Sequence, residues 1–182
     1  FKAALDATVA KKGAVSLCFH AGSWMRSEQM VEVVDYADKT HGGKIKFLTM
    51  LEMHDLMRTN MLAGHSLRDK EGKDNGVRIF DINADGYMDV LIANSDTRMC
   101  RIWNPENSSW KEISFPEKMN SGLRFGVDDK TFKTFVFSTD EKGQNHAWSF
   151  QKNSWIKEAA LTKGLEKVAS HTDGKDAGVR FR

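Results

Sequence analysis

A short segment that recurs along the chain places the strongest limit on its fold. It occurs as GKDNGVRIF at residues 72–80, as GKDAGVRFR at 174–182 and, more loosely, as NSGLRFGV at 120–127. The glycines shared by the three copies, Gly76, Gly122 and Gly178, are 46 and 56 residues apart. A period in this range indicates a set of similar structural units that follow one another along the chain.

From residue 65 onward, apolar and polar residues alternate with a period of two, which is typical of β-strands. Eight short runs show this pattern: GVRIF, MDVLIAN, MCRIW, WKEIS, GLRFGV, TFKTFVFS, HAWSF and WIKE. With about four strands per repeat, the pattern predicts β-propeller blades, about two of them plus the start of a third. Trp103 and Trp110 are seven residues apart, as are Trp148 and Trp155. We interpret these tryptophans as blade packing, with carbohydrate stacking by one of them as the alternative.

Residues 1–63 differ, because helical and strand-like segments alternate there. Helices are expected in FKAALDATVAKK, SEQMVEVVDYADKTHGG and MLEMHDLMRTNML, and Thr49 and Glu52 form a capping box before the last. Strands are expected in AVSLCFH, which has the apolar run of a strand buried on both faces, and in KIKFLT. This α-β-α-β-α order implies parallel strands with helical crossovers. We therefore predict an α/β domain over 1–63, a linker over 64–75 and an all-β domain over 76–182.

The loop DINADGYMD at residues 81–89 has the composition of a cation site. Its oxygen donors would be the side chains of Asp81, Asn83, Asp85 and Asp89 and the backbone carbonyl of Tyr87. Alternate residues of a tightly curled loop point inward, and Gly86 permits the sharp turn. An EF-hand would also need a glutamate where Ile92 stands, and a helix on each side. The loop therefore predicts a calcium site of another kind, with an ordinary polar hairpin turn as the alternative.

The segment NGVRIFDINADGYMDVLIAN resembles an FG-GAP/VCBS repeat, the blade unit of integrin-type β-propellers, whose D-x-[DN]-x-D-G-x-x-D loops bind calcium. The resemblance implies that the four polar side chains of the loop are calcium ligands and that Tyr87 contributes its carbonyl. It covers about residues 72–182 and is specific in the first copy only. In the second copy GLRFG is followed by VDDKTFKTF, so that blade should be metal-free. The third copy stops before its loop would begin.

The segments AVSLCFH and GGKIKFLTMLEM resemble the C-terminal end of a polysaccharide deacetylase domain of the chitooligosaccharide-deacetylase type, a distorted (β/α) barrel. The last motif of that family, Leu-x-x-His, matches Leu17-Cys18-Phe19-His20. The resemblance implies that His20 is the general acid toward the leaving amine and that Leu17 helps line the acetyl pocket. A divalent metal such as Zn²⁺ would activate water in the complete domain, but its ligands belong to motifs that this chain lacks. We therefore expect the chain itself to be inactive, and a polar strand end is the alternative role of His20.

Composition excludes some function classes. The formal net charge is +2 and the basic residues are scattered, so nothing indicates nucleic acid or an anionic membrane surface. The longest apolar run, AVSLCF, is far short of the roughly 20 residues of a membrane span. Cys18 and Cys100 are expected to be small buried residues, with a disulfide between them as the alternative. Because the chain starts at Phe1 and stops inside a repeat, we interpret it as a fragment whose targeting signals lie elsewhere.

Two functional hypotheses follow from the sequence. In the first, the chain is a fragment of an exported carbohydrate-active protein that hydrolyses N- or O-acetyl groups of a polysaccharide, with a calcium-binding propeller for binding or assembly. In the second, it is a non-catalytic, calcium-dependent binding or adhesion module on a degenerate α/β scaffold. Both predict a polysaccharide or glycoprotein ligand, the missing part of the propeller as a partner, and a periplasmic, cell-surface or secreted location.

Overall fold

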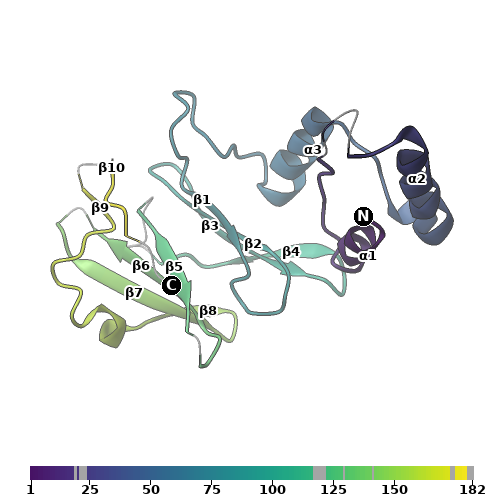
Figure 1. Cartoon of the computed structure of the whole chain (residues 1–182). Helices are drawn as coiled ribbons and strands as arrows, with labels where there is room; N and C mark the ends of the chain where they lie inside the picture. The colour runs from purple at the N-terminus through teal and green to yellow at the C-terminus, as the bar shows by residue number, and fades with distance from the viewer. Residues whose placement is uncertain are drawn as a thin grey trace. The chain divides into compact units, whose positions relative to one another are not determined.

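The chain forms two compact units, Phe1–Asp55 and Leu56–Arg182. The first is helical, and the second contains the strands (Figure 1). The computed structural model describes residues 1–18, 20, 24–116, 122–128, 130–140, 142–172 and 175–179. Phe19 and parts of the second and third repeat copies lie outside the described residues.

The first unit is built on two packed helices. Its elements are α1 (Lys2–Ala10), α2 (Ser27–His41), the short 3₁₀ turn η1 (Gly42–Lys44) and α3 (Met50–Leu56), which leads into the π-helix η2 (Met57–Met61). The core between α1 and α2 consists of Leu5, Val33 and Ala37. The capping box before α3 is confirmed, because the Glu52 N–H donates to Thr49 Oγ1 (3.3 Å) and the Thr49 N–H donates to Glu52 Oε2 (2.8 Å).

The predicted fold class, an α/β barrel end followed by propeller blades, is wrong. The protein is mostly β, with two antiparallel sheets and few helices, and its described residues form no closed barrel or propeller. The described parts of AVSLCFH and KIKFLT contain no strand, and Val15 and Phe47 are exposed. Two apolar residues of these segments, Leu17 and Ile45, pack on the α1–α2 core instead. Helix-to-helix packing thus uses the apolar surface that a parallel sheet would have needed.

The second unit contains two four-stranded antiparallel sheets, each with its strands in chain order. The first sheet consists of β1 (Val77–Phe80), β2 (Asp89–Ala93), β3 (Arg98–Asn104) and β4 (Ser109–Ile113). The second sheet consists of β5 (Arg124–Val127), β6 (Thr134–Thr139), β7 (Asn145–Gln151) and β8 (Ser154–Lys157). Each of the eight predicted runs overlaps one of these strands, which confirms the period-two pattern.

The two sheets share one apolar core. From the first sheet it takes Phe80, Leu91, Ala93, Cys100 and Ile102, and from the second sheet Val136, Trp148 and Phe150, with Leu123 just before β5. The other face of the first sheet carries Val77, Val90 and Ile92, and Leu62 at the end of η2 packs on it. Arg101 holds η2 there, because its Nη1 donates to the carbonyl oxygens of Asn60 (3.0 Å) and Met61 (2.7 Å).

Irregular segments complete the second unit. After β8 come the 3₁₀ turn η3 (Ala159–Thr162) and a small hairpin of β9 (His171–Thr172) and β10 (Lys175–Asp176). Residues 64–75, the predicted linker, form a loop with a single antiparallel bridge between Arg68 and Asp74. None of the described helices is both long and apolar enough to cross a membrane.

Candidate functional site

The loop DINADGYMD connects β1 to β2 at the point where Phe80 pairs with Asp89. Two residues with positive φ angles curl it, Ala84 (+61°) and Gly86 (+83°). Glycine adopts this conformation readily, whereas alanine does so at a cost of about 1–2 kcal/mol. The rest of the loop must therefore hold Ala84 in place.

Side-chain oxygens bind the backbone of the curled loop. The Oδ atoms of Asp81 accept hydrogen bonds from the N–H groups of Asp85 (3.1 Å) and Gly86 (2.7 Å). Asp85 Oδ1 accepts the N–H of Tyr87 (2.9 Å), and Asn83 Oδ1 accepts the N–H of Asp85 (3.2 Å). Asn83 Nδ2 also donates to Asp85 Oδ2 (2.9 Å). These bonds bring the first three predicted donor side chains around one turn of backbone.

Asp89 lies beneath the loop and is fully buried. Its Oδ2 accepts the N–H of Ile82 (2.9 Å) and its Oδ1 accepts the N–H of Trp103 (2.8 Å), which joins the loop to β3. The pKa of Asp89 is raised to about 6, mainly because burial disfavours the carboxylate. The charges of Asp85 and Asp81 also raise it, whereas the two N–H donors act in the opposite direction. Asp89 is thus an anion held close to other anions.

The donor set fits calcium in its chemistry, since each predicted donor is an oxygen and three of them are carboxylates. Each carboxylate oxygen that accepts one N–H keeps further lone-pair capacity. Among the residues that the structure describes, no three His, Cys, Asp or Glu side chains form a metal-binding cluster. The loop thus contains oxygen donors of the kind that calcium prefers, and the assignment of its four side chains and Tyr87 as ligands stays a prediction.

The loop is also fastened to the second sheet. Ile82, at its second position, is 1% exposed and belongs to the core between the sheets. The carbonyl oxygen of Asp81 accepts a hydrogen bond from Thr134 Oγ1 on β6 (3.2 Å). Phe80 stacks on Phe125 of β5 with ring centroids 4.1 Å apart. A change in the conformation of the loop would therefore affect the packing of both sheets.

The two predicted catalytic residues lie in the first unit and play different parts. Leu17 is partly buried at the edge of the α1–α2 core. His20 is exposed, and its ring meets the exposed Trp24 edge-on at 4.7 Å. The described residues of AVSLCFH form no strand, so the roles of His20 as acid and of Leu17 in an acetyl pocket rest on the sequence alone.

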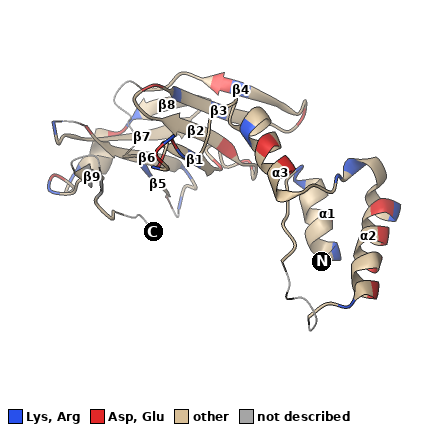
Figure 2. Cartoon of the chain, turned by 90° about the horizontal axis from the view of Figure 1, so that it is seen from above, with Lys and Arg blue, Asp and Glu red and all other residues tan. Residues whose placement is uncertain are grey.

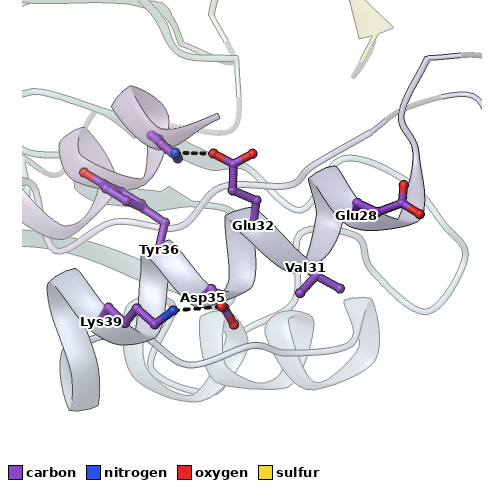
Figure 3. Close-up of a pocket in the computed structure, with 7 residues that line it drawn as sticks. Glu28, Val31, Glu32, Asp35, Tyr36 and Lys39 are labelled. Atoms are coloured by element: carbon purple, nitrogen blue, oxygen red, sulfur yellow. Dashed lines mark hydrogen bonds and ion pairs between the residues drawn. The ribbon is translucent and has the colours of Figure 1, made fainter.

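A pocket of about 420 Å³ lies in the first unit, against α2. Its lining is mostly charged, and opposite charges are paired there: Lys2 with Glu32 (2.6 Å) and Lys39 with Asp35 (2.9 Å). Figure 3 shows the second pair along α2. The charged residues of α2 are mostly acidic, and red segments prevail along it in Figure 2. Exposed ion pairs of this kind contribute little to the free energy of folding. Because the charges are paired, the pocket presents no cluster of like charges that could bind a ligand of the opposite charge.

A His–Asp pair on the second sheet was not predicted from the sequence. His146 Nε2 lies 2.9 Å from Asp140 Oδ2 and the His146 side chain is 7% exposed. The hydrogen bond from His146 lowers the pKa of Asp140 to about 2, helped by the N–H groups of Gln144 and Lys142. The pair closes the β6–β7 turn and has a structural role. An aspartate followed by a Lys-Gly turn and a histidine is the signal that could have revealed it.

We compared the chain with known proteins, and no family model, curated protein or solved structure matched it.

Proposed function

We propose that the chain is a non-catalytic, calcium-dependent binding module, with the β1–β2 loop as its calcium site. The side chains of Asp81, Asn83, Asp85 and Asp89 and the carbonyl of Tyr87 hold the ion. When bound, calcium supplies positive charge to the loop and fixes its curl. The ligand of the module is a polysaccharide or glycoprotein, met outside the cytoplasm.

The observation that carries the proposal is the burial of Asp89 beneath two further carboxylates. Burial and the charges of Asp85 and Asp81 raise the pKa of Asp89 to about 6, so at neutral pH the loop holds an unfavourable anion. A hard cation at the oxygen-rich mouth of the loop would reverse this repulsion.

The deacetylase hypothesis stays a prediction from the sequence resemblance and is not our second candidate. No described contact of Leu17 or His20 favours catalysis, since Leu17 packs on helices and His20 meets Trp24. A binding role needs neither residue.

Titration calorimetry of the full chain with calcium tests the proposal. We expect one calcium per chain, much weaker binding of magnesium, which needs a smaller octahedral shell, and no calcium binding by Asp85→Ala. Asp128→Ala, in the corresponding loop of the second sheet, is the matched control and should bind as the unmodified chain does. Absence of calcium binding by the folded chain, or equal binding by Asp85→Ala, would contradict the proposal.

A further inference from the structure

The turn between β3 and β4 contains the acceptor sequence for N-linked glycosylation. Asn107, Ser108 and Ser109 form the pattern Asn-x-Ser, in which the middle residue is not proline. The chain has nine asparagines, and Asn107 is the only one with a serine or threonine two positions later. Because the pattern is short, its surroundings in the structure decide whether a glycan can be attached there.

The structure places this sequence at an exposed turn. The turn follows Asn104, which pairs with Ser109 at the end of the β3–β4 ladder. All three residues of the pattern are exposed. Ser108 has a φ of +52°, and the Glu106 N–H donates to Asn104 Oδ1 (2.9 Å), so the chain bends sharply on both sides of Asn107. A bulky group on Asn107 would therefore displace no residue of the core.

The side chain of Asn107 is oriented by its own motif. Ser109 Oγ donates to Asn107 Oδ1 (2.6 Å), so the hydroxyl and the amide of the acceptor sequence already lie together in the folded chain. Within the part of the chain that the structure describes, no hydrogen bond engages Asn107 Nδ2. The nitrogen that would form the new bond is thus open to solvent and to a transferase.

The β3–β4 turn lies at the same end of the first sheet as the β1–β2 loop. The four strands are antiparallel and in chain order, so the first and third connections share one end. Asp89 joins the two connections, since its Oδ1 accepts the N–H of Trp103, next to Asn104. In the second sheet the corresponding β7–β8 turn contains Asn153, but Trp155 stands two positions later. The first copy thus differs from the second at two connections of one sheet end.

We propose that Asn107 carries an N-linked glycan at the calcium-loop end of the first sheet. In the transfer, Asn107 Nδ2 forms a bond to C1 of the N-acetylglucosamine of a lipid-linked oligosaccharide. The C1–O bond to the lipid pyrophosphate breaks, the pyrophosphate leaves with the electron pair, and a base of the transferase takes the Nδ2 proton. The inference rests on the proposed location outside the cytoplasm, because this modification belongs to surface loops of secreted chains.

Secretion of the full chain from cultured animal cells, behind a cleavable signal peptide, tests the proposal. Peptide mass spectrometry should find a glycan on Asn107, and peptide N-glycosidase should remove it from the native protein. Asn107→Gln and Ser109→Ala should lose the glycan completely, whereas Ser109→Thr keeps the hydroxyl and should keep the glycan. Asn153→Gln, in the exposed β7–β8 turn, is the matched control and should be glycosylated as the unmodified chain is.

Calcium titration of the same samples separates this inference from the calcium proposal. All four variants change exposed side chains, so they should stay folded by circular dichroism and bind calcium as the unmodified chain does. A secreted, folded chain without a glycan on Asn107 overturns the inference, and so does a glycan that persists in Ser109→Ala. A glycan that the native protein protects from the glycosidase also overturns it, since the turn would then be covered. A glycosylated chain that binds no calcium overturns the calcium proposal alone.

Discussion

The β1–β2 loop of the first sheet and the β5–β6 loop of the second make the same connection with different chemistry. In the second loop, Asp128 Oδ1 accepts the N–H groups of Lys130 (3.1 Å) and Thr131 (2.6 Å) and the Thr131 hydroxyl (2.8 Å). These donors lower the pKa of Asp128, first of all those of Thr131. The first loop contains three carboxylates, and the pKa of its buried Asp89 is raised.

The difference shows that the turn itself does not require the acidic cluster. In the second sheet, Asp128 accepts backbone N–H groups of the connection, which lacks the alternating oxygen donors of the first loop. Burial of Asp89, with a smaller contribution from the charges of Asp85 and Asp81, makes the charged form of Asp89 unfavourable in the folded chain at neutral pH, as its raised pKa indicates. We therefore attribute the additional carboxylates of the β1–β2 loop to the binding of a ligand. Four experiments test how the first copy of the repeat differs from the others.

The largest effect is expected at the glycine that the repeated segments share, which is Gly76 in the first copy and Gly178 in the third. A Cβ on Gly76 would lie 2.1 Å from the Ala93 carbonyl oxygen, and its φ is +70°. Gly178 has a similar φ of +78°, but a Cβ there meets nothing within 4 Å. Gly76→Ala should lower the free energy of unfolding by at least about 3 kcal/mol, against about 1 kcal/mol for Gly178→Ala. Urea denaturation measures the free energy of unfolding of both variants. Equal losses of stability would show that the first and third copies do not differ at this glycine.

Calcium should stabilise the first copy and leave the second untouched. At a hundredfold excess over the dissociation constant, binding adds about 2.7 kcal/mol, which raises the melting temperature by roughly 10 °C. Scanning calorimetry should show this shift in Asp128→Ala and not in Asp81→Ala, and chelator should reverse it. If calcium still raised the melting temperature of Asp81→Ala, the calcium site would lie outside the β1–β2 loop.

In the metal-free chain, Asp89 should make stability depend on pH. Its pKa in the folded state, about 6, lies above its ordinary value of 3.8, so the folded state binds the proton more tightly. The stabilisation is full below about pH 4 and is lost as the pH rises through about 6, a change on the order of 1–2 kcal/mol. Denaturation at pH 4.5 and 7 measures it, and Asp89→Asn should remove this part of the dependence. A rise in stability over the same interval would contradict the assignment.

The smallest effect concerns the link between the loop and the second sheet. Thr134→Val keeps the side-chain shape but removes the hydroxyl that donates to the Asp81 carbonyl oxygen, so it should cost about 1 kcal/mol. Thr162→Val, which removes an exposed bond to the Ala159 carbonyl oxygen, is the control and should cost less. Equal losses of stability for Thr134→Val and Thr162→Val in thermal denaturation would show that the loop does not depend on its bond to the second sheet.

The sequence predicted the strands of the second unit because period-two alternation and turn residues are local signals. It failed for AVSLCFH, since a short apolar run has the same pattern whether it pairs with other strands or covers a helix. Cys18, inside that run, is exposed and free rather than buried, and Cys100 is buried and also free. The positions of Asp81, Asn83 and Asp85 around one turn of the loop also follow from their spacing, whereas their role as calcium ligands stays a prediction. The burial of Asp89 and its bond to Trp103 depend on the sheet as a whole, and no local pattern encodes them.

The side chain of Arg124 bears on the order in which the chain folds during synthesis. It is 8% exposed, and its guanidinium donates to the carbonyl oxygens of Ser170 (3.1 Å) and Val179 (3.1 Å), which lie 46 and 55 residues further along. At a translation rate of roughly 5–20 residues per second, these partners emerge about 2–11 s after Arg124 does. The first sheet closes over much shorter separations, such as the 14 residues between Asp89 and Trp103. A nascent chain should thus complete its first sheet before the carbonyl groups that bind the buried Arg124 guanidinium of the second sheet have emerged.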